Sequence, residues 1–289
     1  MGFLWGCITV LVDLHTHTTA SDGALSPVEL IERAEKAAVR HLAITDHDTV
    51  SGYQAARAWC SANDCELNLW SGVEYSCQSH GATIHVVGLG MDCEHPAMLA
   101  GLSVLAGARE ARCEVIAERL AKKGIEGALV GARAHADGAQ IGRPHFAKFL
   151  VADGYVPDET AAFKRYLGAG KLGDVKAFWP ELDQVIEWIV AAGGVAVLAH
   201  PLKYRFTASK LKRLLAEFVA AGGQAVEVLS GRQSVQDFDR LLRLAREFKL
   251  LVSVGSDFHR DARYSADIGV DVSALAAHGT VWDALTGGV

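Results

Sequence analysis

The chain has 289 residues, enough for one large domain or two ordinary ones. Half of its residues are hydrophobic and 21% are charged, which is typical of a globular protein. Its net charge of −6 argues against binding long nucleic acid, whose affinity depends on many cationic contacts.

The N-terminal stretch is apolar and carries no Lys or Arg before its first acidic residue, Asp13. It is shorter than the roughly 20 residues that span a bilayer, and it lacks the basic start of a secretory signal. We therefore expect a buried first strand in a cytoplasmic protein with no membrane contact. The six cysteines form no CxxC pair, and with no export signal we expect them to be reduced and mostly buried.

Short apolar, β-branched runs alternate with amphipathic helical patterns. The predicted strands are residues 7–14, 41–45, 67–71, 83–89, 194–199, 225–229 and 250–255. The predicted helices are residues 26–39, 51–61, 97–123, 181–192, 209–221 and 234–248. The first of these helices begins with a capping-box pattern of Ser26, Pro27 and Glu29. Such alternation implies an α/β fold of parallel strands linked by crossovers.

One stretch, residues 96–180, shows helical patterns but no convincing strand. It contains twelve Lys and Arg against nine Asp and Glu, so its charge opposes that of the remaining chain. We expect residues 1–95 and 181–289 to form an α/β barrel, and residues 96–180 to be a helical insertion that serves as a substrate-binding lid. A helical decoration without a role in the site is the alternative.

Histidines and carboxylates recur at or near the predicted strands, mostly where a strand ends. In an extended strand, residues two apart point to the same side, so His15 and His17 can reach one ion. In an α/β barrel the carboxyl ends of the strands share one face, where active sites form. Imidazole and carboxylate without thiolate suit Mn²⁺, Fe²⁺ or Zn²⁺ in a hydrolytic site. The candidate metal ligands at these positions include His15, His17, Asp22, His47, Glu74, His85, His200, Asp257 and His259.

These motifs, Asp13-Leu-His-Thr-His17, Thr45-Asp-His-Asp48, Gly72-Val-Glu74, Ala199-His-Pro201 and Gly255-Ser-Asp-Phe-His259, occur in the order seen in the polymerase-and-histidinol-phosphatase (PHP) family, which the chain resembles. The resemblance implies a distorted seven-stranded (β/α) barrel with three divalent ions, Mn²⁺ first among them. It implies that His15, His17, Glu74 and Asp257 hold one ion. Glu74 would bridge to a second ion held by His85 and His200, and Asp22, His47 and His259 would hold the third.

The segment Arg143-Pro-His-Phe-Ala147 resembles a bacterial subgroup described as nucleoside 3′,5′-bisphosphate phosphatases and as RNase AM, a 5′→3′ exonuclease on short RNA. The resemblance implies a substrate that is a small phosphorylated nucleotide or a short RNA 5′ end. We expect Arg143 to grip a phosphate bidentately, and His145 to bind substrate or protonate the leaving oxygen. An ordinary helix start at Pro144 is the alternative for both. Lys171 and Tyr204 are further candidates for substrate binding.

The predicted reaction is hydrolysis of a phosphate ester by a hydroxide that bridges two ions, with Glu74, His145 and Asp257 as the catalytic residues. A histidinol-phosphate phosphatase and an amidohydrolase would share the barrel and the metals. A neutral amide needs no cationic grip, so Arg143 and the basic insertion favour the phosphoesterase. Asp46 either supports its neighbour His47 or has a surface role.

Overall fold

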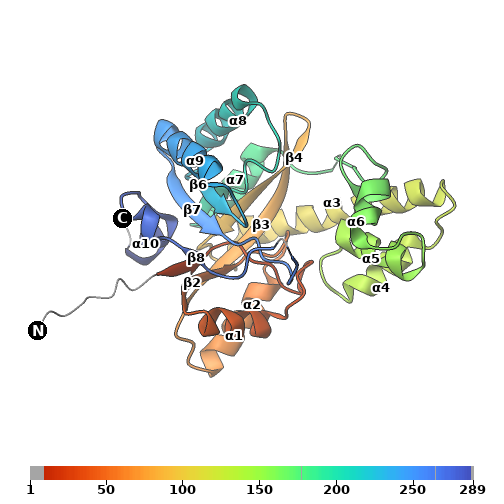
Figure 1. Ribbon diagram of the computed structural model, residues 1–289, viewed down its shortest axis with the longest axis horizontal. Coiled ribbons are helices and arrows are strands. Elements are labelled where there is room, and N and C mark those ends of the chain that lie inside the picture. The colour runs from red at the N-terminus through yellow and green to blue at the C-terminus, as the bar shows by residue number, and fades with distance from the viewer. Residues whose placement is uncertain (1–9, 177, 264, 288–289) are drawn as a thin grey trace, which may run out of the picture.

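The computed structural model describes residues 10–176, 178–263 and 265–287. Its centre is an eight-stranded sheet in the order β7-β6-β5-β4-β3-β2-β1-β8 (Figure 1). The strands are β1 (Leu11–Asp13), β2 (Val39–Ile44), β3 (Asn68–Ser79), β4 (Ala82–Leu89), β5 (Val195–Leu198), β6 (Ala225–Ser230), β7 (Leu251–Gly255) and β8 (Val270–Asp271).

The ends of β1 and β7 meet and nearly close the sheet into a barrel. The Leu14 amide donates to the Val254 carbonyl at 3.0 Å, and the Asp257 amide donates to the His15 carbonyl at 2.9 Å. The predicted α/β barrel is therefore confirmed. These contacts also bring the segments after β1 and β7 together, and both segments carry predicted ligands.

The prediction that the strands are parallel is wrong for β4, which runs antiparallel to both β3 and β5. A two-residue turn at His80 and Gly81 joins β3 to β4, with φ of 50° and 71°. Positive φ at both positions is the geometry that lets a tight turn match strand twist. As a result β3 is longer than predicted, and Glu74 lies inside it instead of at its end. The short strand β8 was not predicted.

Helices cover the outside of the barrel, namely α1 (Pro27–Lys36), α2 (Ser51–Ala62), α7 (Leu182–Ala191), α8 (Ala208–Ala220), α9 (Val235–Phe248) and α10 (Val281–Gly287). The capping box at the start of α1 is confirmed: Ser26 accepts from the Glu29 amide, and the Glu29 carboxylate accepts from the Ser26 amide. In the described residues, no helix is both long and apolar enough to cross a membrane.

The stretch between β4 and α7 is helical, and its described residues contain no strand, as predicted. It consists of α3 (Pro96–Ala121), α4 (Ala128–Ala136), α5 (Arg143–Ala152), α6 (Glu159–Ala162) and the π-helix η1 (Phe163–Leu167). Phe146, Phe149 and Leu150 of α5 pack with Ile116 and Leu120 of α3 in a hydrophobic cluster separate from the barrel core. Helix α3 begins at the barrel and extends to the small helices (Figure 1).

The cysteine prediction needs a correction, because Cys60 and Cys65 form a disulfide with a Cα–Cα distance of 5.1 Å. Cys60 lies in the last turn of α2, and the chain reverses after the helix so that Cys65 returns to it. The sequence offered no CxxC spacing, and this proximity depends on where the helix ends. Cys77, Cys93 and Cys113 are free and buried, as expected. Cys7, with most of the predicted extension of the first strand, lies outside the described residues.

Candidate metal centre

The nine predicted metal ligands lie together at one end of the barrel. Their imidazole and carboxylate atoms form four overlapping groups, and within each group all ligand atoms lie within 4.8 Å of one another. The segments that contribute these ligands are distant in sequence. The order of the strands and the closure of the barrel bring them together. His15 and His17 follow β1, Asp22 lies in the next loop, His47 follows β2, Glu74 is in β3, His85 is in β4, His200 follows β5, and Asp257 and His259 follow β7.

Glu74 is at the centre of the cluster and is 1% exposed. Its Oε1 lies 2.6 Å from His85 Nδ1 and 2.7 Å from His200 Nε2. Its Oε2 faces three more imidazoles, at 3.1 Å from His47 Nδ1 and at 3.3 Å from the Nε2 atoms of His15 and His17. One carboxylate surrounded in this way has the position of a bridging ligand.

Two further carboxylates flank Glu74. Asp22 lies 3.3 Å from His259 Nε2 and 3.9 Å from His47 Nε2. Asp257 Oδ1 lies 3.4 Å from His17 Nε2, and its other oxygen contacts the Lys203 ammonium. Lys203 was not predicted, and it lies only three residues after a candidate ligand.

The cluster contains buried atoms that hydrogen bonding does not satisfy. Among the described residues, His15 Nε2, both ring nitrogens of His17, His47 Nδ1 and Glu74 Oε2 have no hydrogen-bond partner. Buried polar atoms in proteins nearly always have one, and an ion is a common explanation for exceptions. Nitrogen and oxygen atoms without thiolate are suitable ligands for Mn²⁺, Fe²⁺ or Zn²⁺. The residues present therefore fit a cluster of divalent ions.

The electrostatics of the cluster also favour cations. Burial opposes the charged form of Asp257, but His15, His17 and Lys203 outweigh it and hold the pKa of that carboxyl well below its ordinary value. Burial likewise opposes protonation of His17, yet Asp257 and Glu74 raise its pKa to about 10. The ionised carboxylates of this buried site thus stabilise positive charge on or next to the imidazoles. That charge can be a proton or a metal ion.

Glu227, in β6, supports the cluster from behind and is 2% exposed. Its Oε1 lies 3.0 Å from His15 Nδ1, and its Oε2 accepts from the His200 amide at 2.6 Å. A carboxylate that binds one ring nitrogen fixes the tautomer, so the other nitrogen keeps its lone pair for a metal. Sequence analysis missed Glu227, although a single carboxylate in an apolar strand was an available signal.

Asp46 supports the loop that carries Asp22. Its carboxylate accepts from the Thr18 amide at 2.8 Å, from the Thr18 hydroxyl at 2.6 Å and from the Ser21 hydroxyl at 2.6 Å. Asp46 is 1% exposed, which excludes the surface role considered for it.

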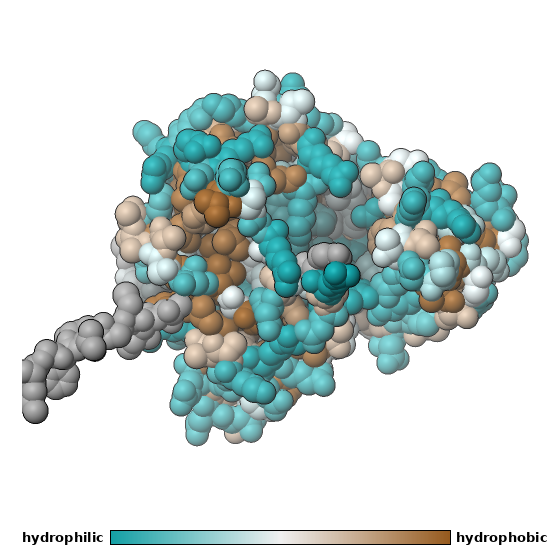
Figure 2. All heavy atoms as spheres, viewed as in Figure 1, coloured by the Kyte–Doolittle hydropathy of each residue, from teal (hydrophilic) through white to brown (hydrophobic). Residues whose placement is uncertain are grey.

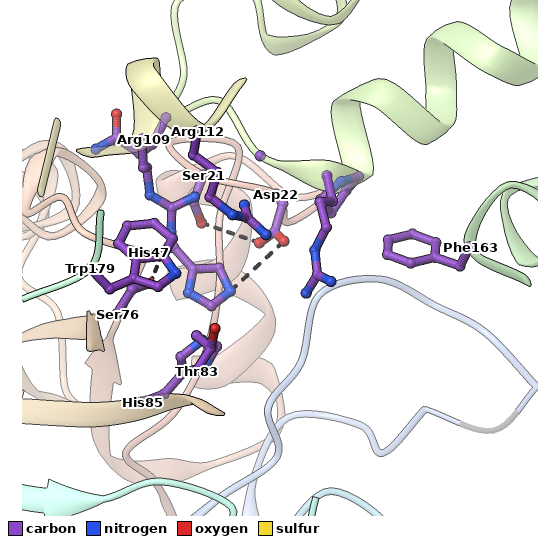
Figure 3. A pocket seen from close by; sticks show the side chains of 14 residues that line it. Ser21, Asp22, His47, Ser76, Thr83, His85, Arg109, Arg112, Phe163 and Trp179 are labelled. Atoms are coloured by element: carbon purple, nitrogen blue, oxygen red, sulfur yellow. Dashed lines mark hydrogen bonds and ion pairs between the residues drawn. The ribbon is translucent and has the colours of Figure 1, made fainter. Parts of the chain in front are cut away.

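A cavity of about 120 Å³ lies beside the cluster, between the barrel and the helical insertion. Figure 3 shows Asp22, His47 and His85 among the side chains that line it, with Arg109 and Arg112 close to them. In Figure 2, hydrophilic residues gather over the middle of this face. The cationic lining comes from the insertion and consists of Arg109, Arg112 and Arg143.

Comparison with known proteins shows the family of the chain. Residues 13–190 match the PHP domain. The chain belongs to the PHP family. A 5′-3′ exoribonuclease of Haemophilus influenzae is 45% identical over 252 residues, which are 87% of this chain and 91% of that protein. A 3′,5′-nucleoside bisphosphate phosphatase of Chromobacterium violaceum is 40% identical over 89% of this chain and 90% of its own length.

A solved structure agrees with the fold. A protein from Chromobacterium violaceum, described as an amidohydrolase and solved with bound sulfate and no metal, has a TM-score of 0.86 and 38% identity. The match covers 95% of each chain.

The predicted substrate-binding residues of this PHP protein do not all reach the cavity. Arg143 lines it, and its Nη1 donates to the Leu167 carbonyl at 3.2 Å. His145 is buried beside a neighbouring hollow, where its Nδ1 accepts from the Gly142 amide at 3.0 Å, as in an ordinary helix start. Lys171 is exposed on the insertion.

Tyr204 contacts backbone instead of the cavity. Its hydroxyl accepts from the His85 amide at 2.9 Å and lies 2.8 Å from the Ala199 carbonyl. It therefore joins β4 to the end of β5, next to two of the clustered histidines. The geometry favours a role in positioning His85 and His200 over contact with substrate.

The structure adds Arg109 and Arg112 of α3, which sequence analysis did not single out. They lie three positions apart and therefore on one face of the helix, and each is 6% exposed. Arg109 forms an ion pair with Asp48 in which both Nε and Nη2 lie 2.6 Å from Oδ2. Asp48 directly follows His47, so this pair connects the insertion to the metal-ligand cluster.

Proposed function

We propose that this chain is a metal-dependent phosphoesterase that acts on small nucleotides with a second phosphate, such as nucleoside 3′,5′-bisphosphates or the 5′-phosphorylated end of short RNA. The observation that carries the proposal is the cavity that joins the metal-ligand cluster to three arginines. Both relatives named above act on such phosphate esters by name, which supports the same substrate class.

The proposed centre holds three divalent ions, with Mn²⁺ as the preferred metal. The ligands are the nine residues of the cluster, with Glu74 shared between sites. Bound ions supply two kinds of chemistry: they lower the pKa of water toward neutrality, and they stabilise charge that develops on phosphoryl oxygens.

The residues of the chain supply orientation around this chemistry. Glu227 fixes the tautomer of His15, and Asp46 holds the loop that carries Asp22. Asp257, in contact with the exposed amine of Lys203, balances charge at the edge of the cluster. Arg143 binds the phosphate that does not react, from the insertion side of the cavity. In this proposal the insertion acts as a substrate-binding lid.

The charge of the cavity supports the proposal over its rivals. An amide substrate carries no phosphate, so Arg112 and Arg143, which pair with no carboxylate within the described residues, would face no anion. A histidinol phosphate carries one phosphate, which the metal ions would already bind. Two phosphates match the two parts of the cavity.

A substrate panel with Mn²⁺ tests the proposal, using a nucleoside 3′,5′-bisphosphate, a 5′-phosphorylated oligoribonucleotide, an aryl phosphate, histidinol phosphate and a dipeptide. We expect the first two to give the highest kcat/KM. Arg143→Ala should lower kcat/KM for them by roughly 10- to 100-fold, since a hydrogen bond to a charged group is lost. The aryl phosphate should be affected much less. Equal losses on all phosphates would remove the second-phosphate role of Arg143.

A further inference from the structure

Trp179, which lines the cavity, carries a buried hydrogen-bond donor. Its side chain lines the cavity close to His47, as Figure 3 shows, and the residue is only 4% exposed. Within the described part of the chain, its indole Nε1 has no hydrogen-bond partner. An unsatisfied buried donor costs about 1–3 kcal/mol, so an N–H group left in this state indicates that it has an external acceptor.

Two arginines hold the indole ring in place. The guanidinium carbons of Arg109 and Arg112 each lie 5.4 Å from the centre of the Trp179 ring. Cations over an aromatic face are attracted by its quadrupole, and here they restrict the direction of the N–H group. The indole is therefore oriented before any ligand binds.

The arginines differ in how their charge is compensated. Arg109 is paired with Asp48, as described above. In the part of the chain that the structure describes, no carboxylate forms an ion pair with Arg112 or Arg143. Arg112 donates from Nε to the Val175 carbonyl at 2.9 Å, which is a neutral acceptor.

Burial of Arg112 and Arg143 without a paired carboxylate among the described residues disfavours their charged forms, and the pKa values of both side chains are lowered. Burial, together with the nearby charges of Arg143 and Arg109, lowers the pKa of Arg112 to about 9. Burial also lowers the pKa of Arg143. Two buried cations that repel each other are stabilised by an anion between them, whereas a neutral ligand or another cation would leave the cost in place.

We propose that Trp179 and Arg112 complete, with Arg143, a binding subsite for the non-reacting phosphate, in which the Trp179 indole N–H donates to a phosphoryl oxygen. This inference rests on the proposed function, and it adds a specificity residue and a second cation to it. Arg112 and Arg143 supply charge, and the indole supplies a donor of fixed direction. A substrate that lacks a second phosphate cannot bind to these arginines or accept the indole hydrogen bond.

Trp179→Phe tests the donor, because it removes the N–H group and keeps an aromatic ring beside the arginines. The control is Trp188→Phe, which makes the same exchange at a buried tryptophan of α7 that does not line the cavity. Each variant is assayed with Mn²⁺ on a nucleoside 3′,5′-bisphosphate and on an aryl phosphate. We expect Trp179→Phe to lower kcat/KM for the bisphosphate by roughly 10- to 100-fold, mainly through KM. The aryl phosphate should change by less than about threefold, as should both substrates with the control variant.

Two outcomes of the assay would overturn the inference. Unchanged bisphosphate kinetics in Trp179→Phe would show that the indole donates to nothing in the complex. Equal losses on both substrates would show that Trp179 acts at the reacting phosphate or only through packing. Arg112→Lys gives a second check, since it keeps the charge and removes the planar guanidinium. It should lower affinity for the bisphosphate and leave the aryl phosphate unchanged.

A binding measurement separates this inference from the proposed function. Calorimetry with inorganic phosphate on the metal-free protein reports the subsite even if no phosphate ester is hydrolysed. Weaker phosphate binding in Trp179→Phe than in wild type and in Trp188→Phe supports the subsite. Equal binding in all three proteins, or none in wild type, overturns it. An inert wild type that still binds phosphate through Trp179 would contradict the proposed function alone.

Discussion

Replacing Glu227 by Gln tests how much of the metal centre depends on residues behind it. The carboxylate accepts two hydrogen bonds, one from the His15 ring and one from the His200 amide. The amide of Gln has nearly the same shape but only one oxygen. If that oxygen faces the His200 amide, the side-chain NH₂ faces His15 Nδ1. The imidazole must then carry its proton on Nε2, which removes the lone pair that faces Glu74 and Asp257.

The opposite orientation is also unfavourable. With its oxygen toward His15, the Gln amide places its NH₂ against the His200 N–H, and two donors face each other in a site that is 2% exposed. Either way a charge-assisted hydrogen bond is lost, which costs about 1.5–3 kcal/mol. Mutation of a residue that hydrogen-bonds to a metal-binding His typically lowers metal affinity or activity by about 10- to 100-fold. We expect Glu227→Gln to fall in that range.

Titration of the metal-free protein with Mn²⁺ measures this effect directly, and elemental analysis gives the number of ions retained. The control is Glu217→Gln, which alters a half-exposed carboxylate that pairs with His80 far from the cluster. The control should keep wild-type affinity, and both variants should keep the wild-type circular dichroism. Wild-type metal affinity in Glu227→Gln would refute the argument that this carboxylate fixes the His15 tautomer.

Three more predictions concern the centre and its support. Glu74→Gln should lower kcat on the order of 100-fold with little change in substrate affinity, because a neutral amide bridges poorly and small displacements are costly; an unchanged kcat would remove Glu74 from the reaction. Chelation should abolish phosphate ester hydrolysis and Mn²⁺ should restore it, with elemental analysis finding more than one ion per chain; full activity without metal would contradict the proposed centre. Arg109→Ala should destabilise the protein by about 3–5 kcal/mol in urea unfolding, because it leaves Asp48 buried and unpaired; a loss below about 1 kcal/mol would show that water or another cation replaces the arginine.

The sequence was most informative where local pattern and position in the barrel coincide. His15 and His17 lie two apart at the end of a strand, and extended geometry alone predicts that both reach one site. Glu74 and His85 were also found from their strands, although the hairpin that joins β3 to β4 was not. The turn at His80 and Gly81 has a positive φ at both residues. Gly adopts a positive φ readily, but His does so rarely, so the sequence gives little sign of this turn.

The residues that sequence analysis missed act through contacts between distant segments. Glu227 matters because β6 lies next to β5, which brings its carboxylate to the His200 amide. Trp179 lies at the end of the insertion, where it lines the cavity and contacts two arginines of α3. No spacing along the chain encodes such contacts, so sequence analysis identified Arg143 as a cation of the site but not Arg109 or Arg112.

Asp48 is a buried position at which the insertion and the barrel are linked. Asp48 accepts from Arg109 of α3 and from the Ser76 amide of β3, and its own carbonyl accepts from the Gln140 side chain. Asp48 also follows His47 and has a φ of 52°, a conformation that these contacts stabilise. Any displacement of α3 would therefore move His47 together with the arginines of the cavity. The fold thus keeps the metal-ligand cluster and the arginines of the cavity in fixed positions relative to each other, as the proposed substrate with two phosphates would require.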